Sequence, residues 1–375
     1  MKASPKTIEA LFASNKNVKR GEKMFGEYPK WFGKPPELKK REWEDNGEES
    51  ETTKKLKDAY RKFLYEIKNR DVCSNDEYPL ASKLIEGINY SSEDITYFLS
   101  ELEKRPEKQS SKSGLFLSAL INGSNENKFT IVTKNFAIPP NCLGYKNLGK
   151  KIIIEGNVGN GIGDRMKDGE ITVKGNAGDV VGRGMESGKI YVEGNAGDWA
   201  GWGIRGGEIR VKGNVENYAG ESMKGGMIIV EGNAGDLVGE GMEGGEIVVK
   251  GNVNYGVGTG MKGGRIVIER DVVVGCVGHG MENGEIVVKG NVEDGVGARM
   301  KGGKIVIEGD VRQLVGGWTE GGTIYLNGEF GAIIPPNFAR SWRGEIYWKG
   351  QLIFKDSEWV GNVRCYYLGA APSWP

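Results

Sequence analysis

The sequence offers few residues with the spacing that catalysis or metal binding requires. The single histidine, His279, lies between two glycines, and the cysteines Cys73, Cys142, Cys276 and Cys365 are far apart with no CxxC pair. A histidine that acts as a base needs polar partners, and a thiolate metal site needs closely spaced cysteines. We therefore expect an inert histidine, isolated reduced thiols, and no disulfide framework, zinc site or iron–sulfur site.

Glycine-rich stretches such as Gly182-Arg183-Gly184 suggest a phosphate-binding loop at first sight. Such a loop needs one glycine motif between a strand and a helix. Here the motif recurs many times with no helix after it, so turn glycines explain it better. Glycoside hydrolysis would need paired carboxylates, but most acidic residues of this region alternate with basic ones. The sequence therefore predicts no catalytic, cofactor-binding or metal-binding residue.

A repeat of 19 residues, with one spacing of 20, organises the sequence between about residues 150 and 330. Its most regular column contains Met166, Met185, Ile204, Met223, Met242, Met261, Met281, Met300 and Thr319. Each unit also contains an Ile-x-Val step, which has the two-residue period of a short strand with one buried face. A single unit cannot bury its apolar face, whereas stacked units can. The repeat therefore predicts a mainly β fold, a solenoid of about nine rungs.

Charged residues alternate in sign from one repeat to the next. Two positions past each strand stand Glu155, Lys174, Glu193, Lys212, Glu231, Lys250, Glu269, Lys289 and Glu308. Because parallel rungs lie about 4.8 Å apart, the alternation puts opposite charges above and below each other. It also accounts for the equal numbers of basic and acidic residues, 51 of each. A chain without net positive charge is not expected to bind nucleic acid.

Asparagines recur at one corner of the repeat, from Asn157 through Asn176 and Asn195 to Asn252. A stacked asparagine ladder at a turn is the natural interpretation.

The flanking segments differ in composition from the repeat. A period of 3.6 residues predicts helices near 56–67 and, after a capping box formed by Ser91 and Asp94, near 95–102. Proline pairs at 139–140 and 335–336 suit caps that prevent edge pairing. We expect a small helical N-terminal domain at 1–112, an N-terminal cap at 113–150, the β-helix at 151–328 and a C-terminal cap at 329–375.

No apolar run approaches the ~18–20 residues of a membrane span, and the first residues lack the apolar core of a signal peptide. We therefore expect no membrane partner and a cytoplasmic location.

The repeat, carried by residues such as Gly182, Met185, Gly188, Ile190 and Val192, resembles the GXGXG domain. That domain is found at the C-terminus of the glutamate synthase large subunit, in one of the subunits of formylmethanofuran dehydrogenase and in stand-alone archaeal relatives. The resemblance implies a right-handed parallel β-helix with an architectural role, which holds catalytic domains or subunits together and contributes no reacting group.

One column of the repeat is a candidate protein-interaction surface. It reads Gly161, Val180, Trp199, Tyr218, Leu237 and Gly256. Strand alternation predicts that these side chains point outward, where Trp202 widens the stripe. A ladder of exposed apolar groups marks an interaction surface. The alternative is that the helical segment or a cap folds back and covers it.

These observations favour a non-catalytic scaffold β-helix, without a cofactor, that mediates protein–protein assembly. The alternative hypothesis is a detached accessory domain of a glutamate synthase-type or formylmethanofuran dehydrogenase-type oxidoreductase complex. In that case the chain has no activity alone, and its protein partners are oxidoreductase subunits.

Overall fold

The computed structural model describes residues 50–67, 77–106, 109–110, 112–317, 319–333, 343–356 and 358–360. The chain divides into two compact units, residues 1–45 and residues 46–375, and the described residues belong to the second. The first 49 residues of the predicted helical domain and the proline pair at 335–336 lie outside the described residues.

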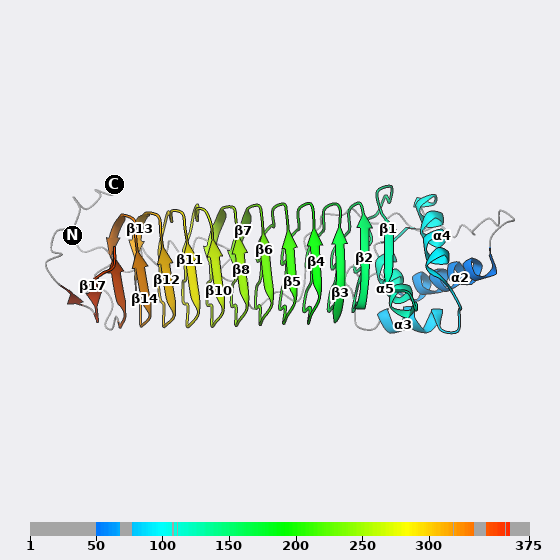
Figure 1. Ribbon diagram of the computed structural model, residues 1–375, viewed down its shortest axis with the longest axis horizontal. Helices are drawn as coiled ribbons and strands as arrows, with labels where there is room; N and C mark the ends of the chain where they lie inside the picture. Colours follow the sequence, from blue (N-terminus) through cyan, green and yellow to red (C-terminus); the bar gives the residue numbers. More distant parts are fainter. Residues whose placement is uncertain are drawn as a thin grey trace. The chain divides into compact units, whose positions relative to one another are not determined.

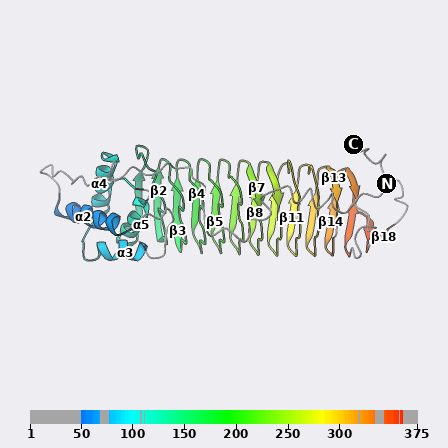
Figure 2. The same ribbon diagram turned by 180° about the vertical axis from the view of Figure 1, so that it is seen from behind.

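Among the described residues, four helices precede the strands: α2 (Glu51–Glu66), α3 (Glu77–Ile85), α4 (Ser92–Glu103) and α5 (Ser113–Gly123). The predicted capping box is confirmed, since Ser91 and Asp94 bond reciprocally at the start of α4. Helices α4 and α5 contact the first two strands, so the helices lie at the β1 end of the sheet (Figures 1 and 2).

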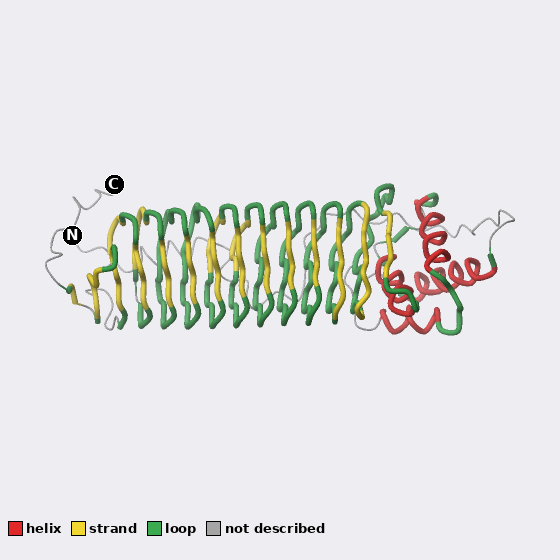
Figure 3. The backbone as a smooth tube through the Cα atoms, in the orientation of Figure 1, coloured by secondary structure: helices red, strands yellow, loops and turns green. Residues whose placement is uncertain are grey.

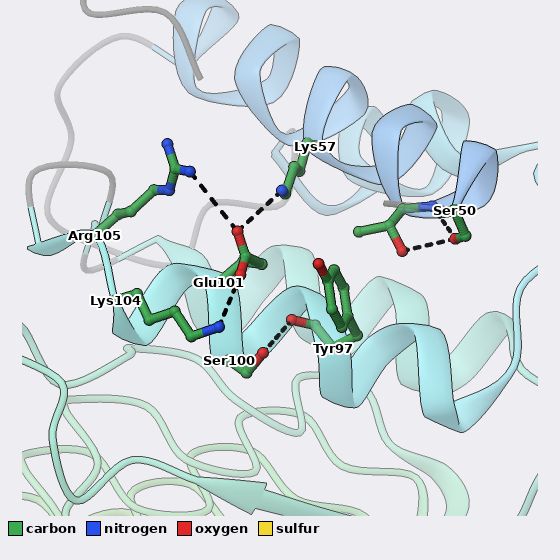
Figure 4. A network of polar contacts seen from close by, with 8 residues as sticks. Ser50, Lys57, Tyr97, Ser100, Glu101, Lys104 and Arg105 are labelled. Atoms are coloured by element: carbon green, nitrogen blue, oxygen red, sulfur yellow. Dashed lines mark hydrogen bonds and ion pairs between the residues drawn. The ribbon is translucent and has the colours of Figure 1, made fainter. Parts of the chain in front are cut away.

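Polar contacts join the helices to one another. The carboxylate of Glu101 on α4 accepts a hydrogen bond from Lys57 of α2 at 3.2 Å and another from Lys104 at 3.1 Å (Figure 4). A second buried ion pair joins Lys112 to Glu77 of α3 at 3.0 Å. Buried ion pairs of this kind favour one arrangement over others more than they stabilise it.

The strands build one 14-stranded sheet in the order β1-β2-β3-β4-β5-β6-β8-β10-β11-β12-β14-β16-β17-β18. The pairs from β1 to β16 are parallel (Figure 1), whereas β17 pairs antiparallel with β16 and with β18. Figure 3 shows the strands of successive rungs side by side. Their bounds are β1 Lys128–Val132, β2 Leu148–Glu155, β3 Asp168–Val173, β4 Lys189–Val192, β5 Glu208–Val211, β6 Met227–Val230, β8 Glu246–Val249, β10 Arg265–Ile268, β11 Glu285–Val288, β12 Lys304–Ile307, β14 Thr323–Leu326, β16 Glu345–Trp348, β17 Gln351–Lys355 and β18 Glu358–Trp359.

A second side of each rung contributes shorter pairings. Strand β7 (Ala234–Val238) pairs in parallel with β9 (Val253–Val257), and β13 (Val311–Val315) pairs with β15 (Phe330–Ile333). Single bridges, such as Ala196 to Val215, continue this line through the other rungs. The predicted mainly β fold, a parallel β-solenoid with helices at its N-terminal end, is confirmed.

The core consists of identical side chains stacked on each other. Ile190 pairs with Ile209 and Val192 with Val211, and all four are at most 1% exposed. The methionine column is fully buried as well. Corner glycines let the rungs approach, because a Cβ on Gly182, at φ +63°, would lie 2.5 Å from Ile209 Cδ1.

The predicted charge and asparagine ladders are both present. Arg265 bonds Glu246 at 2.8 Å on one neighbouring rung and Glu285 at 2.9 Å on the other. The backbone N–H of Asn176 donates to Asn157 Oδ1 at 2.9 Å, and the same bond recurs at Asn195, Asn214, Asn233 and Asn252. Each exposed ion pair contributes little stability, but a column of them fixes the register.

The expectation of four isolated thiols is wrong, because Cys142 is disulfide-bonded. Cys276 is free and buried. Cysteines that are far apart in the sequence can lie close together in the fold, so their spacing did not predict this bond. No helix within the described ranges is long and apolar enough to cross a membrane.

Substituting alanine at two glycines of one rung will separate backbone strain from crowding. Gly182 and Gly184 have nearly the same φ, +63° and +60°, but the nearest atom to an added Cβ is 2.5 Å away at Gly182 and 3.8 Å away at Gly184. We expect Gly184→Ala to cost about 1 kcal/mol from strain alone. Gly182→Ala should cost roughly 2–4 kcal/mol, because overpacking adds to the strain.

The measurement is the urea midpoint of the full-length protein, followed by circular dichroism. If the two variants lose the same amount of stability, the close approach of the rungs at Gly182 adds nothing to the cost of its substitution.

Candidate interaction surface

The candidate surface lies on the second side of the solenoid, between two inward-facing residues of each rung. In one rung these are Ala196 and Ala200, which are 3% and 0% exposed. The three residues between them face away from the core and form three columns along the solenoid. Trp199, Tyr218 and Leu237 stand at the third position of successive rungs, and we call these three residues the aromatic column.

The aromatic column has an uncommon backbone conformation. Trp199, Tyr218 and Leu237 have φ values of 58°, 63° and 60°, and Val180, one rung earlier, has 55°. The rungs on either side place glycine at this position, Gly161 at 77° and Gly256 at 71°. A side chain in the left-handed region costs roughly 1–2 kcal/mol per residue, and glycine avoids that cost. These rungs therefore keep large apolar side chains at a cost in stability.

The sequence predicted outward side chains along the column from strand alternation, which does not describe the backbone at these positions. Strand alternation does not apply where φ is positive, so the turn itself directs these side chains away from the core. Val180 is only 7% exposed and adds little surface, in contrast to the expected four-residue stripe. Trp199, Trp202, Tyr218 and Leu237 are half-buried.

The two aromatic side chains of the column contact each other along the solenoid axis. The rings of Trp199 and Tyr218 stack with centroids 5.3 Å apart and planes 9° from parallel. Leu237 lies over the next rung, since a Cβ on Gly256 would be 2.9 Å from its Cδ2. Trp202 is separate from this stack and lies next to the Arg183 guanidinium, 6.0 Å from its ring centroid. The column is thus a continuous apolar ridge with Trp202 beside it.

Three further apolar residues on this side extend the ridge and were missed by the sequence analysis. Tyr255 stands one position before the column, and Val273 and Val274 are 45% and 56% exposed. Tyr255 and Val274 are 19 residues apart and stand one position before Gly256 and Gly275, so a search of the column itself passes over them. A search for apolar residues at the column position or at the position before it would have found Tyr255 and Val274.

Carboxylates lie on both sides of the aromatic column. Asp198 and Asp236 precede it, and Glu221 and Glu240 follow it in the column of Trp202. Glu221 accepts a hydrogen bond from Trp199 Nε1 at 2.9 Å. The pKa of Tyr218 is raised by burial and then by the four carboxylates around it, Glu240, Glu221, Asp198 and Asp236.

These carboxylates are also perturbed themselves. Burial raises the pKa of Glu221, and burial together with the charge of Glu221 raises the pKa of Glu240. On the preceding column, burial and the charge of Asp198 raise the pKa of Asp179, although the backbone N–H of Asp198 partly offsets both. The surface therefore concentrates negative charge around an apolar ridge.

The other residues considered in the sequence lie outside the aromatic column. His279 is half-buried, and burial together with Arg299 lowers its pKa. No cluster of metal-binding side chains exists among the residues that the structure describes. A surface hollow near Tyr191 and Arg210 has charged walls, and its Arg210 pairs with Glu231 at 3.1 Å. Gly182 and Gly184 are turn glycines with positive φ, not a phosphate loop.

Comparisons with known proteins agree with the repeat pattern. Residues 141–272 match the family model of the GXGXG motif, which confirms the predicted resemblance. One similar solved structure is a chain of the formyltransferase/hydrolase complex (FhcABCD) from Methylorubrum extorquens in complex with methylofuran, with 30% sequence identity and a TM-score of 0.33. The match covers 37% of this chain and 55% of that chain, so the chain spans about half the length of this relative. A search of curated proteins found no match.

Alanine and glycine at position 199 will test whether the column is strained. Both substitutions remove the stacking on Tyr218, but only glycine relieves the left-handed backbone. We expect Trp199→Gly to be more stable than Trp199→Ala by about 1 kcal/mol, the reverse of their usual order in strands. Urea unfolding of the full-length variants measures the difference. If alanine is the more stable, the backbone at position 199 is not strained.

Replacing Glu240 will test the electrostatics through the pH dependence of stability. Its folded pKa is raised, so the folded state holds the proton more tightly than the unfolded state does. Ionisation therefore destabilises the fold above that pKa, and the penalty disappears as the pH falls through it. Glu240→Gln should raise the thermal midpoint at about pH 7 and have little effect at about pH 4, near the model-peptide value.

The matched control is Glu282→Gln, because the ion pair with Lys301 lowers the pKa of Glu282. This variant should not raise the midpoint at neutral pH. A similar rise of the thermal midpoint in both variants would mean that burial near the column does not raise the pKa of Glu240.

Proposed function

We propose that this chain is a non-catalytic scaffold subunit that binds a protein partner through the aromatic column. The observation that supports this most is the left-handed backbone of Trp199, Tyr218 and Leu237. Glycine at these positions would relieve the backbone strain and would keep the rungs stacked, as it does at Gly161 and Gly256. Large apolar side chains kept at a cost in stability, and half-exposed, are typical of a binding surface.

An assembly role is also consistent with the rest of the surface. Elsewhere along the solenoid the outward charges pair between rungs, as Lys174 does with Glu155 at 2.9 Å and Lys301 with Glu282 at 3.0 Å. Such faces are already neutralised and offer a partner little to recognise. The second side of the rungs from Asp198 to Val274 lacks this pairing and exposes apolar groups.

The GXGXG match over residues 141–272 supports a second candidate, an accessory domain of a glutamate synthase-type or formylmethanofuran dehydrogenase-type oxidoreductase complex. In this case the scaffold holds oxidoreductase subunits. A flavin or iron–sulfur absorbance that copurifies with the full chain in fixed ratio would support it. A partner without any redox group would favour a scaffold of another kind. The cytoplasmic location and the domain boundaries drawn from the sequence stay predictions.

Purification of the tagged full-length chain from its source cells tests the scaffold role. The wild type is compared with Trp199→Gly/Tyr218→Gly, in which glycine keeps the backbone conformation and removes both side chains. We expect the wild type to elute as a complex of defined mass and stoichiometry and the double variant to elute alone. Circular dichroism and the thermal midpoint confirm that both are folded.

The matched control is Tyr325→Ser/Tyr347→Ser, which removes a second stacked pair, 4.9 Å between centroids, from the 14-stranded sheet. This control should keep the complex. A complex that survives the loss of Trp199 and Tyr218, or that is lost equally in the control, would contradict docking at the aromatic column.

A further inference from the structure

The aromatic column offers the edges of its rings to a partner. Trp199 and Tyr218 stack at 5.3 Å, so each ring covers one face of the other, and Leu237 continues the stack over Gly256. A sugar ring binds by lying flat on an open aromatic face, which this arrangement provides poorly. A ridge of ring edges and aliphatic groups instead suits the apolar side chains of a polypeptide.

Carboxylates dominate the charge around the ridge, although Arg183, which pairs with Asp164, lies next to Trp202. Asp179, Asp198 and Asp236 lie in the column before it, Glu216 lies beside them, and Glu221 and Glu240 follow it. None of these six carboxylates has an ion pair with any residue in the described parts of the chain. The 14-stranded sheet differs, because its acidic columns alternate with lysine and arginine.

Some of these carboxylates also have structural roles. Asp179 Oδ1 accepts from the backbone N–H of Asp198 at 3.1 Å, and Asp198 Oδ1 accepts from that of Asn217 at 2.8 Å. Glu216 and Glu240 have no such bond to a described residue, and Glu221 bonds Trp199 through one oxygen. These three glutamates can therefore be changed with little effect on the rung-to-rung ladder.

We propose that the aromatic column docks a short segment of a partner protein in which apolar residues alternate with lysine or arginine. The inference rests on the proposed scaffold function and adds the chemistry of the partner. The ridge from Trp199 to Val274 spans four rung steps, about 19 Å, the length of roughly six extended residues. Nucleic acid and anionic membranes carry the same sign of charge as this surface, so like-charge repulsion opposes them.

Fluorescence anisotropy with the full-length protein and labelled synthetic peptides tests the proposal. The probes are peptides of about eight residues that alternate lysine with valine, lysine with serine, or glutamate with valine. We expect the lysine–valine peptide to bind at least about tenfold more tightly than the other two, with affinity falling as salt rises from about 50 to 300 mM.

The variant that removes the charge is Glu216→Gln/Glu221→Gln/Glu240→Gln, and it should weaken the lysine–valine peptide by about tenfold or more. Its control is Glu193→Gln/Glu231→Gln/Glu269→Gln, which makes the same change in net charge on the 14-stranded sheet. The control should retain most of the affinity, because its carboxylates are already paired with basic residues of neighbouring rungs.

Several results would overturn the inference. They are equal weakening in both triple variants, equal binding of the lysine–serine peptide, preference for the glutamate–valine peptide, and no binding to the wild type. A concentration-dependent dimer that Trp199→Gly/Tyr218→Gly abolishes would identify a second copy of the chain as the occupant instead. If the complex from source cells is lost in that double variant but kept in the Glu216/Glu221/Glu240 variant, the scaffold function stands and the basic partner does not.

Discussion

The structure depends on one constraint: each side chain must tolerate a copy of its own position about 4.8 Å above and below it. Apolar residues meet this constraint by stacking on themselves, as Ile190 does on Ile209. Asparagine meets it because its side chain accepts a hydrogen bond from the next backbone N–H. Charged residues meet it only by alternating in sign, and glycine meets it where rungs turn and approach closely.

The aromatic column satisfies this constraint, but its backbone is strained. Trp199 and Tyr218 stack well, but at a turn where glycine would remove the strain. The nearby acidic residues do not alternate with basic ones, so charges accumulate that the other faces neutralise. Local departures from a rule that the rest of the chain obeys are where function is expected. The two departures coincide on one side of the same few rungs, and this coincidence is the basis for a docking surface.

The ends of the solenoid show how the same backbone avoids uncontrolled pairing. An exposed parallel edge would pair with another chain. At the first end, helices α4 and α5 contact β1 and β2. At the other end, β17 reverses direction and pairs antiparallel with β16, and β18 pairs antiparallel with β17.

The sequence by itself determined the solenoid, because a 19-residue period, alternating charges and an Ile-x-Val step admit only parallel stacking in register. It also determined α2 and α4, whose apolar faces have a helical period. It could not reveal α5, which is buried along almost its whole length and has no polar face to show a period. Nor could it reveal the disulfide of Cys142, since sequence separation does not report distance in space. Only the tertiary structure showed the left-handed backbone beneath Trp199 and Tyr218 and brought Glu221 and Glu240 beside them, because both depend on how one rung lies against the next.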